Sequence, residues 1–94
     1  MLWTEMIRLK TADAGAEGLQ SLFLDAMRHV AKEPGLVQAK IYSSARNPNE
    51  LALSLVWDTD PPEHKGSRAG LCISQALQVF GLVELSVWIE QSLT

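Results

Sequence analysis

The clearest pattern along the chain is a pair of apolar stripes at helical spacing. The first stripe consists of Leu19, Leu22, Phe23, Ala26, Met27 and Val30. Intervals of three and four positions place these residues on one face of an amphipathic helix. Pro34 and Gly35 end that helix, because the residue before a proline avoids the α region and glycine permits a reversal. The second stripe predicts a helix over about 67–80, and its members are Ala69, Ile73, Ala76, Leu77 and Phe80.

Four other segments are rich in apolar and β-compatible residues, and the last three alternate with a period of two, which is typical of β-strands. They cover residues 2–10, 36–43, 51–57 and 82–90. About six turn residues separate the second segment from the third, which indicates a hairpin. The order of elements predicts the α+β class and the ferredoxin-like βαββαβ fold, with one antiparallel sheet and two helices on one face.

Length and composition restrict the class of protein. The 94 residues form one domain, 1–94, and the apolar fraction of 47% and charged fraction of 20% are ordinary for a globular chain. No run of about eighteen apolar residues occurs, so we expect no membrane-spanning helix. The first residues lack the basic and then apolar pattern of a signal peptide, and the single cysteine cannot form an internal disulfide. These features predict a cytoplasmic location.

Charge and motif spacing exclude several further classes. Eight basic and eleven acidic residues give a net charge of −3, and the basic residues are scattered, so the chain has no nucleic-acid footprint. Two separated histidines and one cysteine do not make a closed metal site. The glycines are dispersed and form no lysine-containing phosphate loop.

The sheet face away from the helices is predicted to be mixed in character. Its expected members are Leu36, Gln38, Lys40, Tyr42, Ala52, Ser54, Val56, Leu82, Glu84, Ser86 and Trp88, and on the first strand, where the parity is ambiguous, we prefer Leu2, Thr4, Met6 and Arg8. This face is too apolar for a solvated surface and too polar for a dry core. A large apolar surface on a small chain indicates a partner, and two-fold pairing with a second copy is the commonest arrangement. The sequence therefore predicts a homodimer whose two sheets face each other.

Three features of the chain are similar to those of a known family. They are the order and length of the elements, the run 32–36 (Lys-Glu-Pro-Gly-Leu) and the strand end 56–58 (Val-Trp-Asp). The chain resembles the dimeric α+β barrel proteins, in particular the antibiotic-biosynthesis-monooxygenase-like group. The resemblance implies a two-fold barrel with a cavity on the non-helix side of each sheet. Some members oxidise polycyclic aromatic substrates with molecular oxygen and no metal or flavin, so the resemblance implies no cofactor. Others degrade haem.

The haem-degrading branch is an unsuitable match. That branch uses an asparagine in the first strand, a tryptophan near the end of the third strand and a histidine on the second helix. Trp57 stands where that tryptophan would be, but the middle of the first strand is Glu5-Met6-Ile7. The nearest histidine to the second helix is His64, in the loop before it.

Two groups of side chains are candidates for ligand contact. Trp88 and Tyr42 can be aromatic walls for a flat ligand or packing at the dimer interface. Met6 and Ser54 are expected beside them as further walls. Trp57 is either a ligand contact or part of the core, and its continuation of the apolar stripe 51–57 favours the core.

The ionisable candidates also have two interpretations each. His64 is either a catalytic base or ligand contact at a cavity mouth, or an exposed loop histidine. Glu84, Lys40 and Arg8 either act as acid, base or anchor in the cavity, or form an internal ion pair.

Two further side chains receive little functional weight. We interpret His29 as a surface or boundary residue. Cys72 is expected to be a small buried hydrophobe rather than a nucleophile.

The leading hypothesis is a homodimeric barrel that binds a small hydrophobic, aromatic molecule between sheet and helices. On this hypothesis it is a cofactor-independent monooxygenase, with His64 or Glu84 as the ionisable group. One alternative is a non-catalytic binder or sensor on the same fold. The other is a structural module whose barrel interior is filled by its own side chains. Fold resemblance alone does not decide among them.

Overall fold

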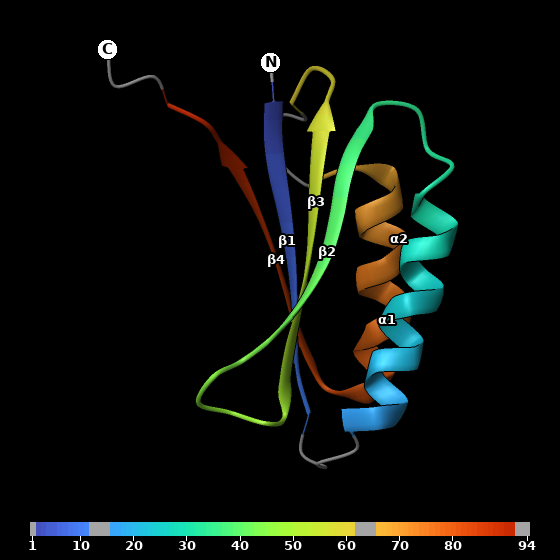
Figure 1. The fold of residues 1–94 in the computed structure, drawn as a ribbon, viewed down its shortest axis with the longest axis vertical. Coiled ribbons are helices and arrows are strands. Elements are labelled where there is room, and N and C mark those ends of the chain that lie inside the picture. Colours follow the sequence, from blue (N-terminus) through green and yellow to red (C-terminus); the bar gives the residue numbers. More distant parts are fainter. Residues whose placement is uncertain (1, 12–15, 62–65, 92–94) are drawn as a thin grey trace.

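The computed structural model describes residues 2–11, 16–61 and 66–91. Its elements in chain order are β1 (Leu2–Lys10), α1 (Ala16–Val30), β2 (Leu36–Ser43), β3 (Glu50–Asp58), α2 (Arg68–Leu77), a 3-10 turn (Gln78–Phe80) and β4 (Leu82–Ile89). The strands form one antiparallel sheet in the order β2-β3-β1-β4. Both helices cover the same face of this sheet (Figure 1). The predicted ferredoxin-like βαββαβ fold is confirmed.

The core lies between the sheet and the helices. β1 and β3 bury every second residue, because successive side chains of a strand point to opposite faces. The core consists of Trp3, Ile7, Leu9, Phe23, Val30, Leu51, Leu53, Leu55, Trp57, Ile73 and Leu77. The preferred parity of the first strand is therefore correct, since Ile7 and Leu9 face the helices and Arg8 does not. Each fully buried large apolar side chain contributes about 1.5–3 kcal/mol through removal from water.

The helix ends are set by short polar and glycine signals. Ser67 caps α2, and its hydroxyl oxygen accepts a hydrogen bond of 2.9 Å from the backbone N–H of Gly70. After α1, Gly35 adopts a positive φ of 88°, which permits the reversal into β2. The Gly35 carbonyl then accepts a 2.7 Å bond from the Asp58 backbone N–H, which ties the start of β2 to the end of β3.

One predicted position on the second strand is wrong. Leu36 was expected on the open face, but it pairs with Trp57 and packs against the core. A β-bulge causes the difference, because Gln38 pairs with Val56 and Val37 becomes an extra residue. An extra residue reverses the alternation on one side of the bulge. Val37 is consequently 57% exposed.

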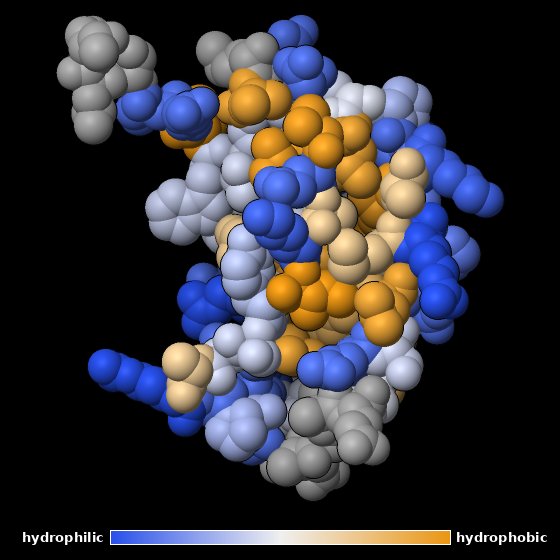
Figure 2. Space-filling view, viewed as in Figure 1, coloured by the Kyte–Doolittle hydropathy of each residue, from blue (hydrophilic) through white to orange (hydrophobic). Residues whose placement is uncertain are grey.

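The surface of this fold combines apolar and polar zones. Figure 2 shows apolar side chains gathered down the middle of one view, where the helix layer meets the sheet, with polar side chains around them. In the part of the chain that the structure describes, no helix has the length and apolarity needed to cross a membrane.

Candidate functional site

The predicted contact residues share the face of the sheet that the helices leave open. The register arranges this face in rows that run across β2, β3, β1 and β4. The rows are Tyr42, Ala52, Arg8 and Glu84; Lys40, Ser54, Met6 and Ser86; and Gln38, Val56, Thr4 and Trp88. Seven predicted site residues therefore lie on one surface, which we call the open face: Met6, Arg8, Lys40, Tyr42, Ser54, Glu84 and Trp88.

The open face presents large apolar side chains to solvent in the single chain. Trp88 is 62% exposed and Tyr42 is 48% exposed. The indole nitrogen of Trp88 donates a 2.8 Å hydrogen bond to the hydroxyl of Ser86, which fixes the orientation of the ring relative to β4. Leu2 and Leu82, near the ends of β1 and β4, are also exposed. The aromatic side chains are therefore positioned for contact with another surface.

Arg8 on the open face forms an ion pair with Glu50, which is not among the predicted site residues. Arg8 lies 3.0 Å from a Glu50 carboxylate oxygen through one terminal guanidinium nitrogen, and its Nε donates to the same oxygen at 3.2 Å. Two hollows of about 180 and 370 Å³ flank this pair. Within the described ranges, Lys40 and Glu84 form no ion pair, although Glu84 is opposite Arg8 in the register.

Two predicted site residues do not lie on the open face. His64 falls outside the described residues. Trp57 is buried in the core, where its ring stacks on Trp3 with centroids 6.0 Å apart and planes inclined by 21°. This environment agrees with the core interpretation of Trp57.

Sequence reasoning missed a buried carboxylate beneath α2. Glu5 is fully buried, and its Oε1 accepts hydrogen bonds from Trp57 Nε1 at 3.1 Å and Ser67 Oγ at 2.7 Å. Its Oε2 accepts a 2.6 Å bond from the Ser67 backbone N–H. The position of Glu5 in the strand could have indicated its burial, because Glu5 lies on the same side of β1 as Trp3 and Ile7.

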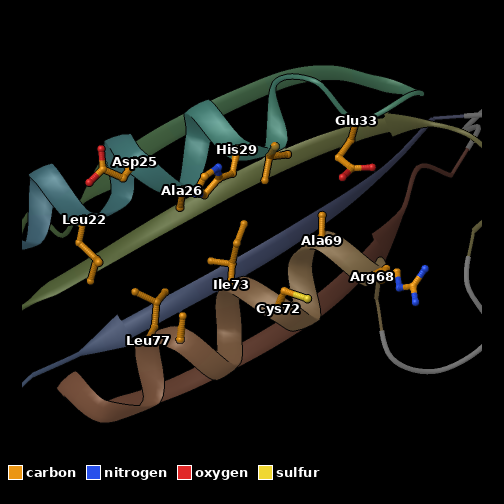
Figure 3. Close-up of a pocket in the computed structure, with 12 residues that line it drawn as sticks. Leu22, Asp25, Ala26, His29, Glu33, Arg68, Ala69, Cys72, Ile73 and Leu77 are labelled. Carbon is orange, nitrogen blue, oxygen red and sulfur yellow. The ribbon is translucent and has the colours of Figure 1, made fainter.

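A cavity of about 520 Å³ lies between the two helices (Figure 3). α1 and the turn after it contribute Leu22, Asp25, Ala26, His29, Val30 and Glu33. α2 contributes Arg68, Ala69, Cys72, Ile73, Ala76 and Leu77. Most of this lining is apolar, and the polar groups are few, as in small-molecule sites.

The polar groups of the cavity come from both walls. Figure 3 shows His29 and Glu33 on the α1 side and Cys72 and Arg68 on the α2 side. Cys72 is exposed, so its expected burial is wrong. It lies at the edge of the apolar stripe, and the gap between the helices leaves it uncovered.

A second hollow adjoins the cavity near the Glu5 cluster. This hollow of about 320 Å³ shares Glu33, Arg68 and Ala69 with the cavity and reaches Trp57 and Ser67. Among residues 2–11, 16–61 and 66–91, no cluster of three or more potential metal ligands occurs. The arrangement can hold an apolar molecule, with a few polar groups to orient it.

Most of the predicted ligand contacts lie on the opposite side of the sheet from the cavity. A cavity does lie on the helix side, but none of the predicted contact residues lines it, and Trp57 borders the neighbouring hollow instead. Of the two ionisable candidates, Glu84 is on the opposite face of the sheet. His29 lies in the cavity wall instead, although the sequence gave it little weight.

Comparison with known proteins identifies the fold. No family model matches the chain, and no curated protein sequence matches it. Among solved structures, Rv0793 from Mycobacterium tuberculosis is 21% identical with a TM-score of 0.72, covering 98% of this chain and 97% of that one. SnoaB, a cofactor-independent oxygenase from Streptomyces nogalater, is 19% identical with a TM-score of 0.68, covering 98% and 96%.

A third similar structure is a candidate antibiotic biosynthesis monooxygenase from Nitrosomonas europaea. It is 16% identical with a TM-score of 0.70, and the match covers 98% of this chain and 90% of that one. The predicted resemblance to the antibiotic-biosynthesis-monooxygenase-like group is thus confirmed at the level of the fold.

Proposed function

We propose that this chain forms a homodimer through its open face and binds a small aromatic molecule in the cavity between its helices. We further propose that it oxidises this molecule with molecular oxygen and without a cofactor. The cavity between α1 and α2 is the observation that carries the proposal. The fold shared with a cofactor-independent oxygenase supports the reaction class.

The proposed dimer covers the exposed apolar part of the open face. Two sheets that pack face to face lie about 10 Å apart and interdigitate the side chains of their inner faces. Trp88 and Tyr42 are suited to this contact, because aromatic residues are enriched at interfaces. A two-fold axis brings the same face of each copy together, so each aromatic contact occurs twice.

The cavity suits a ligand of a few fused rings. Ligand sites commonly span about 300–1,000 Å³ and combine apolar walls with a small number of polar groups. Leu22, Ile73 and Leu77 provide apolar contact, and a phenolic hydroxyl can donate to a carboxylate of Asp25 or Glu33 at the rim. His29 is the side chain in this wall best suited to accept a substrate proton, because imidazole is the commonest general base.

The proposed reaction needs no external reductant. With an anthrone as substrate, the base removes a proton from the ring CH₂, and the resulting anion donates electrons to molecular oxygen. One oxygen atom becomes the new carbonyl oxygen, and the other leaves as water with the two hydrogens of the CH₂ group. The substrate is oxidised to the quinone and oxygen is reduced. The protein orients the substrate, excludes water and accepts the proton.

Two measurements test this proposal. Binding of 1-naphthol is measured by thermal shift and fluorescence titration, and anthrone oxidation by oxygen uptake and quinone formation above the uncatalysed rate. We expect His29→Gln to lower the oxidation rate by about 10²-fold, the usual contribution of general base catalysis, while naphthol binding persists. Binding without oxygen uptake would favour the non-catalytic binder. Absence of binding to a broad phenolic panel would overturn the proposal.

A further inference from the structure

We propose that Glu5 is a positioning residue for the cavity: through Ser67, its buried carboxylate fixes the first turn of α2 and hence the α2 wall. The link to ligand affinity rests on the proposed function, whereas the link to α2 does not. The starting observation is a fully buried carboxylate held by three neutral donors. In the part of the chain that the structure describes, no cation pairs with Glu5.

The hydrogen bonds to Glu5 have a defined direction. A carboxylate oxygen only accepts, so the Ser67 hydroxyl must donate its proton to Oε1. The hydroxyl oxygen keeps its lone pairs for the backbone N–H of Gly70, which donates at 2.9 Å. A continuous chain therefore runs from the Gly70 amide through Ser67 to Glu5. Chains of this kind strengthen each bond and fix the groups that form them.

The same contact holds the backbone of α2 close to β1. The Ser67 backbone N–H donates directly to Glu5 Oε2, and the N-terminus of a helix favours a negative charge. A Cβ atom at Gly66 or Gly70 would collide with the Glu5 carboxylate, so a side chain at either position would force the carboxylate out of its place. The start of α2 is thus fitted around this carboxylate.

The first turn of α2 is also part of the cavity wall. Arg68 and Ala69 follow Ser67 directly and line the cavity, and Cys72 lies about one turn further on. The Leu71 backbone N–H donates to the Ser67 carbonyl at 2.9 Å, so the turn moves with Ser67. A change in the Glu5 contact therefore displaces the groups that face the ligand.

The decisive variant is Glu5→Gln, which keeps the size of the side chain. A carboxamide has one accepting oxygen, so one of the three donors from Trp57 and Ser67 meets an N–H group instead. The matched control is Glu90→Gln, which removes an exposed carboxylate outside the sheet. All measurements are made at a temperature where each variant is fully folded, so that global unfolding does not contribute.

We expect two effects of Glu5→Gln that the control lacks. Amide hydrogen exchange at Gly70 and Leu71 becomes about tenfold faster, and the Kd for 1-naphthol rises about fivefold. Ser67→Ala should produce the same two effects. In the Ser67→Ala background, Glu5→Gln should raise the Kd by much less than it does alone, because the chain to Gly70 is already broken.

Several outcomes would overturn the inference. Unchanged exchange at Gly70 and Leu71 would show that Glu5 does not hold the first turn. A lower melting temperature with an unchanged Kd would make Glu5 a purely structural residue. If Glu5→Gln does not fold, Glu5→Asp, which keeps two accepting oxygens but draws them back by one methylene, decides by the same two measurements. If the unaltered protein does not bind 1-naphthol, the proposed function fails. Amide hydrogen exchange alone then tests whether Glu5 fixes the first turn of α2.

Discussion

The indole nitrogen of Trp57 donates a 3.1 Å hydrogen bond to the Glu5 carboxylate, in the buried layer between β1, β3 and α2. The stacked neighbour, Trp3, donates at 3.0 Å to the neutral hydroxyl of Thr59. The two indoles are similarly buried, but their acceptors differ both in charge and in burial, because Glu5 is fully buried and Thr59 is exposed. This difference provides an internal comparison between a charge-assisted and a neutral hydrogen bond.

We expect Trp57→Phe to destabilise the fold more than Trp3→Phe. Both changes remove one indole donor and part of one ring. A bond to a charged group contributes about 1.5–3 kcal/mol, and a neutral one about 0.5–1.5 kcal/mol. The expected excess is about 1 kcal/mol in the free energy of unfolding, measured by urea denaturation with both slopes compared. Equal losses would contradict a special contribution of the Glu5 acceptor.

The open face leads to a prediction about association. Trp88→Lys places a charge where the proposed dimer needs an aromatic contact, and the two-fold axis applies the change twice. We expect the dissociation constant of the dimer to rise at least about tenfold, measured by sedimentation equilibrium across a dilution series. Val79→Lys is the matched control, because Val79 is 82% exposed but lies in the 3-10 turn, away from the sheet. A well-folded monomer of the unaltered chain in dilute solution would overturn the proposed dimer.

The Arg8–Glu50 pair tests the same interface through electrostatics. The Arg8 side chain is 51% exposed in the single chain, so the pair contributes about 1 kcal/mol or less there. Association of two open faces removes water from Arg8 and makes an unpaired charge more costly. We therefore expect Glu50→Gln to be nearly neutral in the Trp88→Lys background and distinctly destabilising in the dimer. Thermal unfolding of the four combinations measures the difference, and equal effects in both backgrounds would show that Arg8 stays solvated.

The sequence was sufficient for the elements because their patterns are local. The strands 2–10 and 36–43 agree with the structure, and the parity preferred for the first strand, which the sequence left ambiguous, has Ile7 toward the helices as observed. The bulge at Val37 was not predictable, because only pairing with β3 shows which residue is extra. The fold was therefore derived more reliably than the side of β2 on which Leu36 lies.

The site was less predictable because it depends on distant contacts. The donors to Glu5 lie 52 and 62 positions away in the sequence, so no local pattern indicates them. The cavity was unpredictable for the same reason. The apolar stripes show which helix faces are buried but not the gap between the helices. Ile73 and Leu77 serve both the core and the cavity. Cys72, expected inside, borders that gap and stays exposed.

The cavity itself can be closed by a single substitution. Ala26→Leu adds three carbon atoms to the α1 wall, where space is available, so we expect the chain to fold normally. The added side chain occupies the space of a ring, and the stabilisation by 1-naphthol should disappear from the thermal shift. Ala31→Leu is the control, because Ala31 is exposed just after α1 and does not line the cavity. If Ala26→Leu binds as well as the control, the ligand lies elsewhere, and the hollows beside Arg8 on the open face become the site to test.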